Sequence, residues 1–111
     1  MNFTQEKING ALIKKVHLTY ATKEYAENFK DFLMSDVEKN NLNIIADLTY
    51  CEFIDSTFIS VLVTALKAVN KNNGSLKIIA SHPNVKSVLE LTGMVRVFQI
   101  FRTREDALSI V

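Results

Sequence analysis

Residues 11–18 alternate between apolar and polar side chains, Leu12 aside, as half-buried β-strands do. We predict strands over residues 3–8 and 11–18, the second with Ile13, Val16 and Leu18 turned toward a core. Asn9-Gly10 stands between them, and this dipeptide is the strongest short signal for a two-residue hairpin turn. The chain is therefore expected to begin with an antiparallel hairpin.

A helical period replaces the alternation between residues 23 and 39. Apolar residues then recur three and four positions apart, which brings them onto one helix face: Ala26, Phe29, Leu33 and Val37. Thr22 is suited to cap the start of this helix, and Asn40-Asn41 to end it.

A second helix is predicted over residues 57–71. The side chains expected to face its core are Ile59, Leu62, Val63, Leu66 and Val69. Gly74 follows Asn72-Asn73 and is suited to the left-handed conformation that ends a helix.

Short apolar runs at residues 43–48, 76–80 and 95–101 predict three further strands. Phe98, Ile100 and Phe101 in the last run are read as core residues. Pro83 suits the first position of a helix that ends at Gly93. The apolar side of that helix is expected to consist of Val85, Val88, Leu89 and Leu91. A terminal helix is predicted over residues 103–110, with Thr103 as its cap.

The predicted order is β-β-α-β-α-β-α-β-α, an alternation that implies right-handed crossovers between parallel strands. We expect an α/β fold with a mixed, mostly parallel sheet of 4–5 strands and about four helices. The 111 residues fit one domain, spanning 1–111.

The composition argues against several classes of function. Thirteen basic and 12 acidic residues give a net charge of +1, which argues against direct nucleic-acid binding. With one cysteine there is no internal disulfide, and the longest apolar stretches fall short of the ~20 residues that a membrane helix needs. The N-terminus lacks a signal-peptide pattern. We expect a cytoplasmic protein without membrane insertion.

The chemistry is concentrated between residues 44 and 58. A buried strand ends at Asp47-Leu48, a loop follows, and Asp55-Ser56-Thr57 lies where the next helix begins. The first turn of a helix has free N–H groups and the positive end of the helix dipole. A hydroxyl placed there is a suitable point for a phosphate, which adds up to about two negative charges.

This strand, the Ile54-Asp55-Ser56-Thr57 motif and the apolar helix after it resemble the signature of STAS domains. The likeness is strongest to bacterial anti-sigma factor antagonists. Three later segments resemble the same family: 74–79, the helix ending in Leu91-Thr92-Gly93, and 103–108. Together the matching segments extend from about residue 8 to 110.

The resemblance implies that Ser56 is the phosphorylated residue. It implies a partner-binding site of Asp47, Asp55, Ser56, Thr57 and Phe58. The partner would be an anti-sigma factor, usually a serine-protein kinase, bound while Ser56 is unmodified; a phosphatase would reset the switch. No catalytic residue, cofactor or metal is expected.

Two segments depart from the family pattern. Phe58 stands where the motif normally continues with glycine, and residues 17–22 replace the usual glycine-containing turn. Phe58 favours an alternative, in which an exposed apolar patch docks the chain onto a lipid-transport ATPase or a stressosome-like scaffold without phosphorylation.

Plainer interpretations remain for the same residues. Ser56 could serve only as a helix cap. Asp47 and Asp55 could hold magnesium, although we favour a role in solvating strand and helix ends.

Cys51, His17 and His82 are too scattered for zinc, and Cys51 is read as a buried or loop residue rather than a nucleophile. Arg96, Arg102 and Arg104 are read as a solvated edge. A response-regulator receiver domain is excluded, because it needs an acidic pair after its first strand. Leu18-Thr19-Tyr20 offers none. A small enzyme or nucleotide-binding domain finds no supporting residue set.

Overall fold

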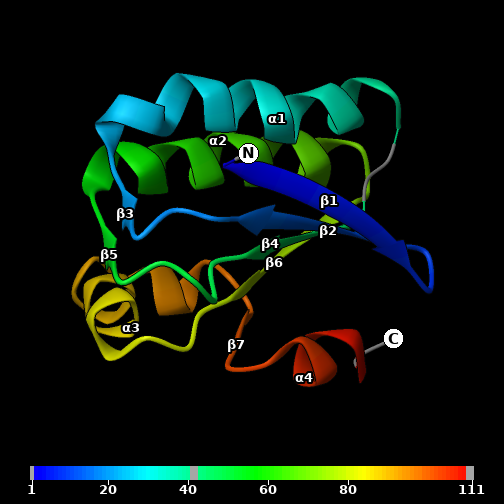
Figure 1. The fold of residues 1–111 in the computed structure, drawn as a ribbon. Helices are drawn as coiled ribbons and strands as arrows, with labels where there is room; N and C mark the ends of the chain where they lie inside the picture. Colours follow the sequence, from blue (N-terminus) through cyan, green and yellow to red (C-terminus); the bar gives the residue numbers. More distant parts are fainter. Residues whose placement is uncertain (1, 41–42, 110–111) are drawn as a thin grey trace.

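The computed structural model describes residues 2–40 and 43–109. A five-stranded sheet lies at its centre, with strand order β1-β2-β4-β6-β7, and only β1 runs antiparallel to its neighbour. Helices α1 and α2 cover one face of the sheet, and α3 and α4 lie on the other side of the molecule (Figure 1). The expected mixed, mostly parallel α/β sheet is confirmed.

The N-terminal hairpin forms as predicted. Strands β1 (Phe3–Ile8) and β2 (Ala11–Val16) pair in antiparallel register, so that Ile8 lies opposite Ala11. Asn9 and Gly10 both have positive φ, at 51° and 81°, as a tight hairpin turn of this twist requires. Strand β2 ends two residues earlier than expected, because the chain then turns toward α1.

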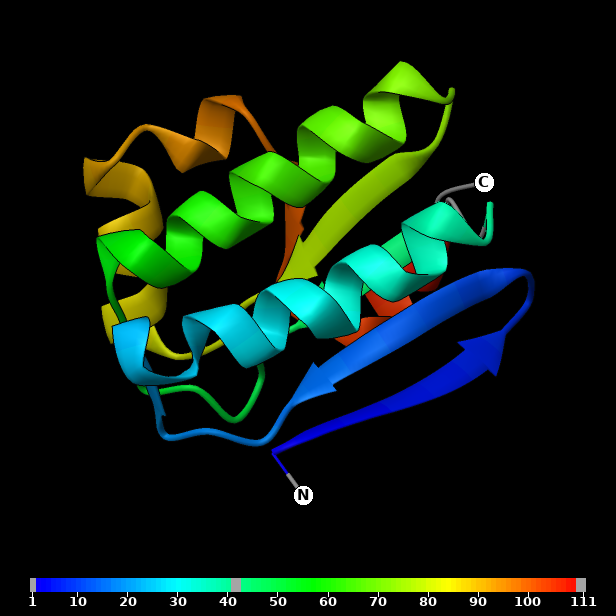
Figure 2. The ribbon, with the colours of Figure 1, turned by 90° about the horizontal axis from the view of Figure 1, so that it is seen from above.

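Helices α1 (Ala26–Glu38) and α2 (Ser56–Lys71) lie side by side and begin at the same end of the molecule (Figure 2). A 3₁₀ turn, η1 (Lys23–Tyr25), precedes α1 in place of its first predicted turn. Thr22 is the N-cap residue of this turn, but its side chain makes no capping hydrogen bond. Asn40 has a φ of 62° and supports the predicted stop; Asn41 lies outside the described residues.

Strands β4 (Asn43–Asp47) and β6 (Ser75–Ile79) form the buried centre of the sheet. At the turn between α2 and β6, Asn73 takes the left-handed conformation with a φ of 64°, and the prediction for Gly74 is wrong. Asparagine tolerates this conformation better than most residues with a side chain. The amide of Gly74 donates to the Val69 carbonyl over 2.7 Å and closes the turn.

The segment after α3 (Pro83–Leu91) differs most from the prediction. Gly93 ends the helix with a φ of 75°, but a 3₁₀ turn, η2 (Met94–Arg96), follows where a strand was expected. Only β7 (Ile100–Phe101) joins the sheet, beside Ile78 and Ile79. Leu91, expected on the apolar side of this helix, is its last residue and is 85% exposed.

Helix α4 (Arg104–Ser109) is capped by Thr103, whose hydroxyl accepts from the Asp106 amide at 3.2 Å, as predicted; Ile110 lies outside the described residues. Arg104 is not simply a solvated edge residue, since its guanidinium donates to Glu6 Oε1 at 2.6 Å. Within the described ranges, no helix has both the length and the apolar character needed to cross a membrane.

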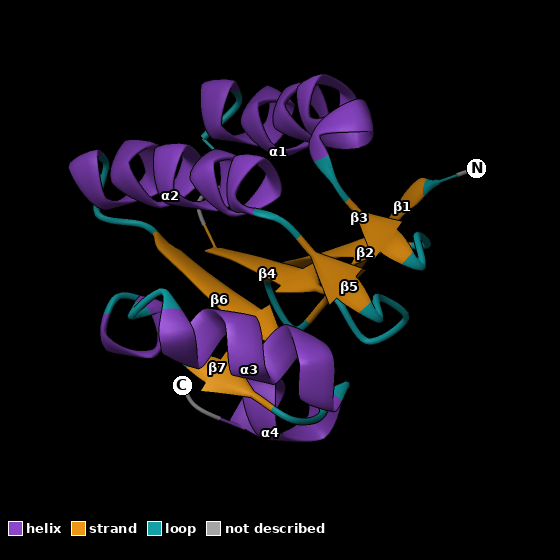
Figure 3. Cartoon of the chain, turned by 90° about the vertical axis from the view of Figure 1, so that its left-hand side faces the viewer, coloured by secondary structure: helices purple, strands orange, loops and turns teal. Residues whose placement is uncertain are grey.

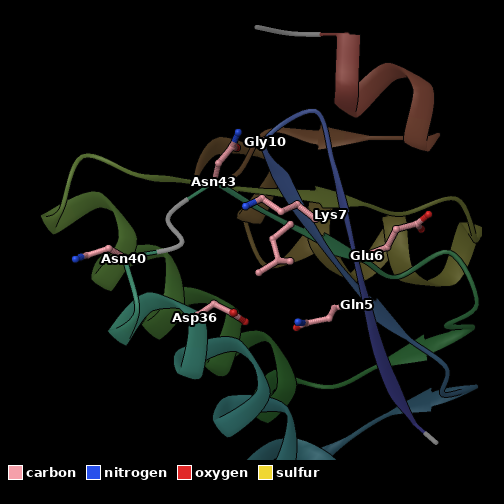
Figure 4. Close-up of a pocket in the computed structure, with 8 residues that line it drawn as sticks. Gln5, Glu6, Lys7, Gly10, Asp36, Asn40 and Asn43 are labelled. Carbon is pink, nitrogen blue, oxygen red and sulfur yellow. The ribbon is translucent and has the colours of Figure 1, made fainter.

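A buried ion pair lies between the hairpin and α1, and the alternating pattern did not predict it. Lys14 on β2 is fully buried, and its ammonium pairs with Asp36 on α1. It also donates to Gln5 Oε1 at 2.6 Å and to the Phe32 carbonyl at 2.9 Å, and lies 4.0 Å from the centre of the Phe32 ring. Gln5 on β1 and Asp36 on α1 face each other across the space between these two elements (Figure 4). Burial lowers the pKa of Lys14, and the hydrogen bond that its ammonium donates to Asp36 opposes that change.

Candidate functional site

Asp55 organises the start of α2. It is the N-cap residue, with extended backbone, and its Oδ1 accepts from the Phe58 amide at 2.9 Å. Its Oδ2 accepts from the Lys23 amide at 2.8 Å, at the start of η1. One carboxylate therefore caps two helical segments that lie 32 residues apart in the sequence.

Ser56 is the first residue of α2 and is exposed. Across the described part of the chain, its hydroxyl has no hydrogen-bond partner, whereas its carbonyl accepts from the Ser60 hydroxyl at 3.0 Å. The interpretation of Ser56 as a helix cap is wrong, because Asp55 fills that position. The hydroxyl is left free for another group.

The surroundings of Ser56 suit an added phosphate. Thr57, the next residue, is also exposed. The N–H groups of a first helical turn have no partner within the helix, and the dipole is positive there. Asp55 occupies the amide of Phe58 but leaves those of Ser56 and Thr57 outside its own hydrogen bonds.

An open groove runs from Ser56 along the outer side of α2. Its volume is about 430 Å³, and it lies between α2 and the segment that follows α3. The residues lining it include Ile59, Val63, Lys67 and Met94. A partner that contacts Ser56 would meet this mixed apolar and basic groove next to it.

Phe58 does not belong to the exposed surface. Its side chain is fully buried, and its ring stacks on Phe29 of α1 with centroids 4.2 Å apart and an interplanar angle of 8°. The expectation that Phe58 extends an exposed apolar patch is therefore wrong. The ring is buried because α1, which carries Phe29, packs beside α2 (Figure 2).

Asp47 is also buried, at 5% exposure, and is the last residue of β4. Its Oδ1 accepts from the backbone amide of Thr49 at 3.0 Å and from the Thr49 hydroxyl. The side chain shapes the loop rather than offering a carboxylate to a partner. Of the five predicted site residues, the structure thus brings Asp55, Ser56 and Thr57 together near the surface.

The two histidines considered for a metal site form polar contacts within the fold. His82 accepts from the Asn84 amide through Nδ1 at 3.1 Å and caps α3, and His17 lies 2.7 Å from the Thr4 hydroxyl. Among residues 2–40 and 43–109, no group of three or more His, Cys, Asp or Glu side chains is arranged to hold a metal ion.

Cys51 is fully buried, and burial, aided by the charge of Asp47, raises the pKa of its thiol to about 12. Because the thiolate is the reactive form, we expect no measurable labelling of the native protein by a disulfide reagent such as DTNB at pH 8. The same protein unfolded in urea should react promptly. Fast labelling under native conditions would contradict the burial of this thiol.

The sequence did not predict a pair of exposed aromatic residues beside the site. Tyr20 and Phe53 lie on two short parallel strands, β3 (Tyr20–Ala21) and β5 (Phe53–Ile54), which form a separate small sheet. Two-residue strands are too short to produce a detectable alternation. The small sheet lies just before the start of α2 (Figure 3).

Comparison with known proteins identifies the family of this chain. Residues 18–107 match the family model described as "STAS domain". A Bordetella bronchiseptica protein named "Putative anti-sigma factor antagonist BtrV" is 27% identical over 107 residues, covering 96% of this chain and 91% of its own.

Comparison with solved structures leads to the same family. A crystal structure of a "putative anti-sigma factor antagonist" from Thermotoga maritima has a TM-score of 0.87 at 25% identity, covering 96% of this chain and 92% of that one. The Bacillus cell fate determinant SpoIIAA in its phosphorylated form shares the fold, with a TM-score of 0.72 at 14% identity and 96% of both chains covered. The family expected from the Asp55-Ser56-Thr57 motif is confirmed, and the chain belongs to the STAS domain family.

Proposed function

We propose that this protein is an anti-sigma factor antagonist, a non-catalytic binding protein of the cytoplasm. It binds an anti-sigma factor of the serine-kinase type while Ser56 is unmodified, and phosphorylation of Ser56 releases that partner. A phosphatase restores the binding form. The protein thus regulates transcription indirectly, without contacting nucleic acid.

One observation carries the proposal: the Ser56 hydroxyl is exposed and free at the first residue of α2, because Asp55 already caps the helix. A kinase needs such an accessible hydroxyl. A phosphate on it would add up to about two negative charges close to the Asp55 carboxylate. A partner surface fitted to the neutral hydroxyl would then meet both steric and electrostatic conflict.

The names of the similar proteins support the same function. The Bordetella and Thermotoga relatives are described as anti-sigma factor antagonists. The phosphorylated SpoIIAA structure supports the idea that this fold accommodates a phosphate. The docking alternative loses its motivating observation, since Phe58 is buried rather than exposed.

The test uses Ser56→Asp and the unmodified protein as paired baits in lysate of the native cell, with mass spectrometry of the bound proteins. We expect only the unmodified bait to recover an ATP-dependent serine kinase, with binding by Ser56→Asp reduced at least tenfold. Thr57→Asp is the matched control, because it adds the same charge one residue further along the same exposed turn, and it should reduce binding less.

Recovery of the same transporter or scaffold proteins by both baits would contradict the phosphorylation switch and favour the docking alternative. Incubation of the recovered kinase with ATP and the unmodified protein supplies a second readout. Phosphate found on a residue other than Ser56 would contradict the site assignment.

A further inference from the structure

Cationic and hydroxyl side chains line a pocket beside α3, which we call the α3 pocket. Its volume is about 460 Å³. Lys86 and Ser87 come from α3, Ser81 from the loop that leads into this helix, and Arg102 from the position directly after β7. The residues that line the α3 pocket differ from those of the groove beside Ser56, so the two are separate places on the surface.

The carboxyl ends of two neighbouring strands form one side of the α3 pocket. Strands β6 and β7 are parallel, and the Ala80 amide donates to the Phe101 carbonyl at 2.8 Å where they end. Ser81 and Arg102 directly follow these two bonded residues, so their backbones are held side by side. In open α/β sheets, ligands bind outside the carboxyl ends of the strands. The α3 pocket therefore lies at the end of the sheet where such folds place their ligands.

One face of α3 forms the other side. Four of the lining residues are spaced three or four positions apart and so share a helix face: Pro83, Lys86, Ser87 and Glu90. The Lys86 amide donates to the His82 carbonyl at 3.0 Å, which fixes the backbone of Lys86 in the first turns of the helix. The dipole of α3 is positive at this end and adds to the charge of the Lys86 ammonium.

The polar groups of the α3 pocket are available to a ligand. Within residues 2–40 and 43–109, four side chains have no hydrogen-bond or ion-pair partner: Ser81, Lys86, Ser87 and Arg102. Of the described residues that line the pocket, only Glu90 is acidic, and no ion pair joins it to either cation. Two cations against one carboxylate leave the α3 pocket with a net positive charge.

This set of donors suits a tetrahedral oxyanion. A phosphate group presents three or more oxygens that point in different directions, whereas a carboxylate presents two oxygens in one plane. The donors reach the α3 pocket from three places, namely α3, the loop before it and the end of β7. Guanidinium groups bind phosphate oxygens in pairs, and lysine binds them as a point charge. The arrangement therefore favours a phosphate group over a carboxylate.

We propose that Ser81, Lys86, Ser87 and Arg102 form a binding site for a phosphate group, carried either by inorganic phosphate or by a small phosphomonoester. The site is additional to the Ser56 switch and does not rest on the proposed function. Glu90 lowers its affinity, because the carboxylate repels a phosphate held beside the two cations.

The test is an NMR titration of the folded, isotope-labelled protein with sodium phosphate, glycerol 3-phosphate and acetate at constant ionic strength. We expect the amide signals of Ser81, Lys86 and Arg102 to shift saturably with both phosphates and much less with acetate. Tighter binding of glycerol 3-phosphate by about threefold or more identifies a phosphomonoester as the ligand. Equal binding of the two identifies the phosphate group alone as the recognised unit.

Single charge changes locate the site. Lys86→Gln and Arg102→Gln should each raise the dissociation constant about tenfold, the loss expected for one charge-assisted hydrogen bond. Glu90→Gln should lower it, because the repulsion is removed, and a merely damaged fold would not bind more tightly. Lys30→Gln is the matched control, since it removes the same charge from an exposed position of α1, and it should leave the dissociation constant unchanged.

Three results would overturn the proposal: shifts that do not saturate, acetate bound as tightly as phosphate, or an equal loss in Lys30→Gln and Lys86→Gln. Weaker binding by Glu90→Gln would also contradict it, because the carboxylate would then assist the ligand rather than repel it.

Discussion

Replacement of Phe58 by alanine is expected to lower the free energy of unfolding by about 3–5 kcal/mol, as for other fully buried phenylalanines. The ring is fully buried and stacks on Phe29, which itself stacks on Phe3 with centroids 5.7 Å apart. The change therefore removes one end of an aromatic series that joins α2, α1 and β1. Urea denaturation followed by circular dichroism measures the loss.

Thr57→Ala is the appropriate control, because Thr57 is the exposed neighbour on the same helical turn and should change stability by less than about 1 kcal/mol. A loss below 1 kcal/mol for Phe58→Ala would show that the ring is not packed as described. Loss of partner binding in a Phe58 variant that is still fully folded would restore a direct role for this residue in docking.

Removal of Asp36 is expected to have the second large effect, about 3–5 kcal/mol of destabilisation. The substitution Asp36→Ala leaves the Lys14 ammonium fully buried without its counter-charge. The carbonyl of Phe32 and the amide oxygen of Gln5 would remain as hydrogen-bond acceptors, but neither carries a full negative charge. Denaturation at neutral pH measures the cost.

The double variant Lys14→Met with Asp36→Leu separates the charge from the packing. Replacing both members of a buried ion pair by apolar residues of similar size is often neutral or stabilising, so this variant should recover most of the lost stability. Asp31→Ala, on an exposed position of α1, is the control and should be near neutral. A double variant as unstable as Asp36→Ala would show that the polar network, not charge balance, holds the hairpin to α1.

Most of the fold could be predicted because its signals are local. The period of Ala26, Phe29, Leu33 and Val37 locates α1, and all four side chains are buried. Asn9-Gly10 alone specifies the hairpin turn. The family resemblance and the position of Ser56 both follow from one contiguous motif.

The errors arise where distant contacts override local pattern. Residues 95–101 read as one strand, but only Ile100 and Phe101 of that segment pair with the sheet, beside Ile78 and Ile79. Lys14 alternates like an exposed residue, and only Asp36, 22 residues later, makes its burial tolerable. Phe58 reads as a surface ring because nothing in the motif shows that Phe29 covers it.

The two bonds of Asp55 have a consequence for the thermodynamics of association. Loops that recognise a partner usually lose conformational entropy on binding, and this loss reduces affinity. Here the carboxylate fixes the Lys23 and Phe58 amides in the free protein. Folding has already met much of that ordering cost, so the free protein offers a partner a surface that is largely preorganised.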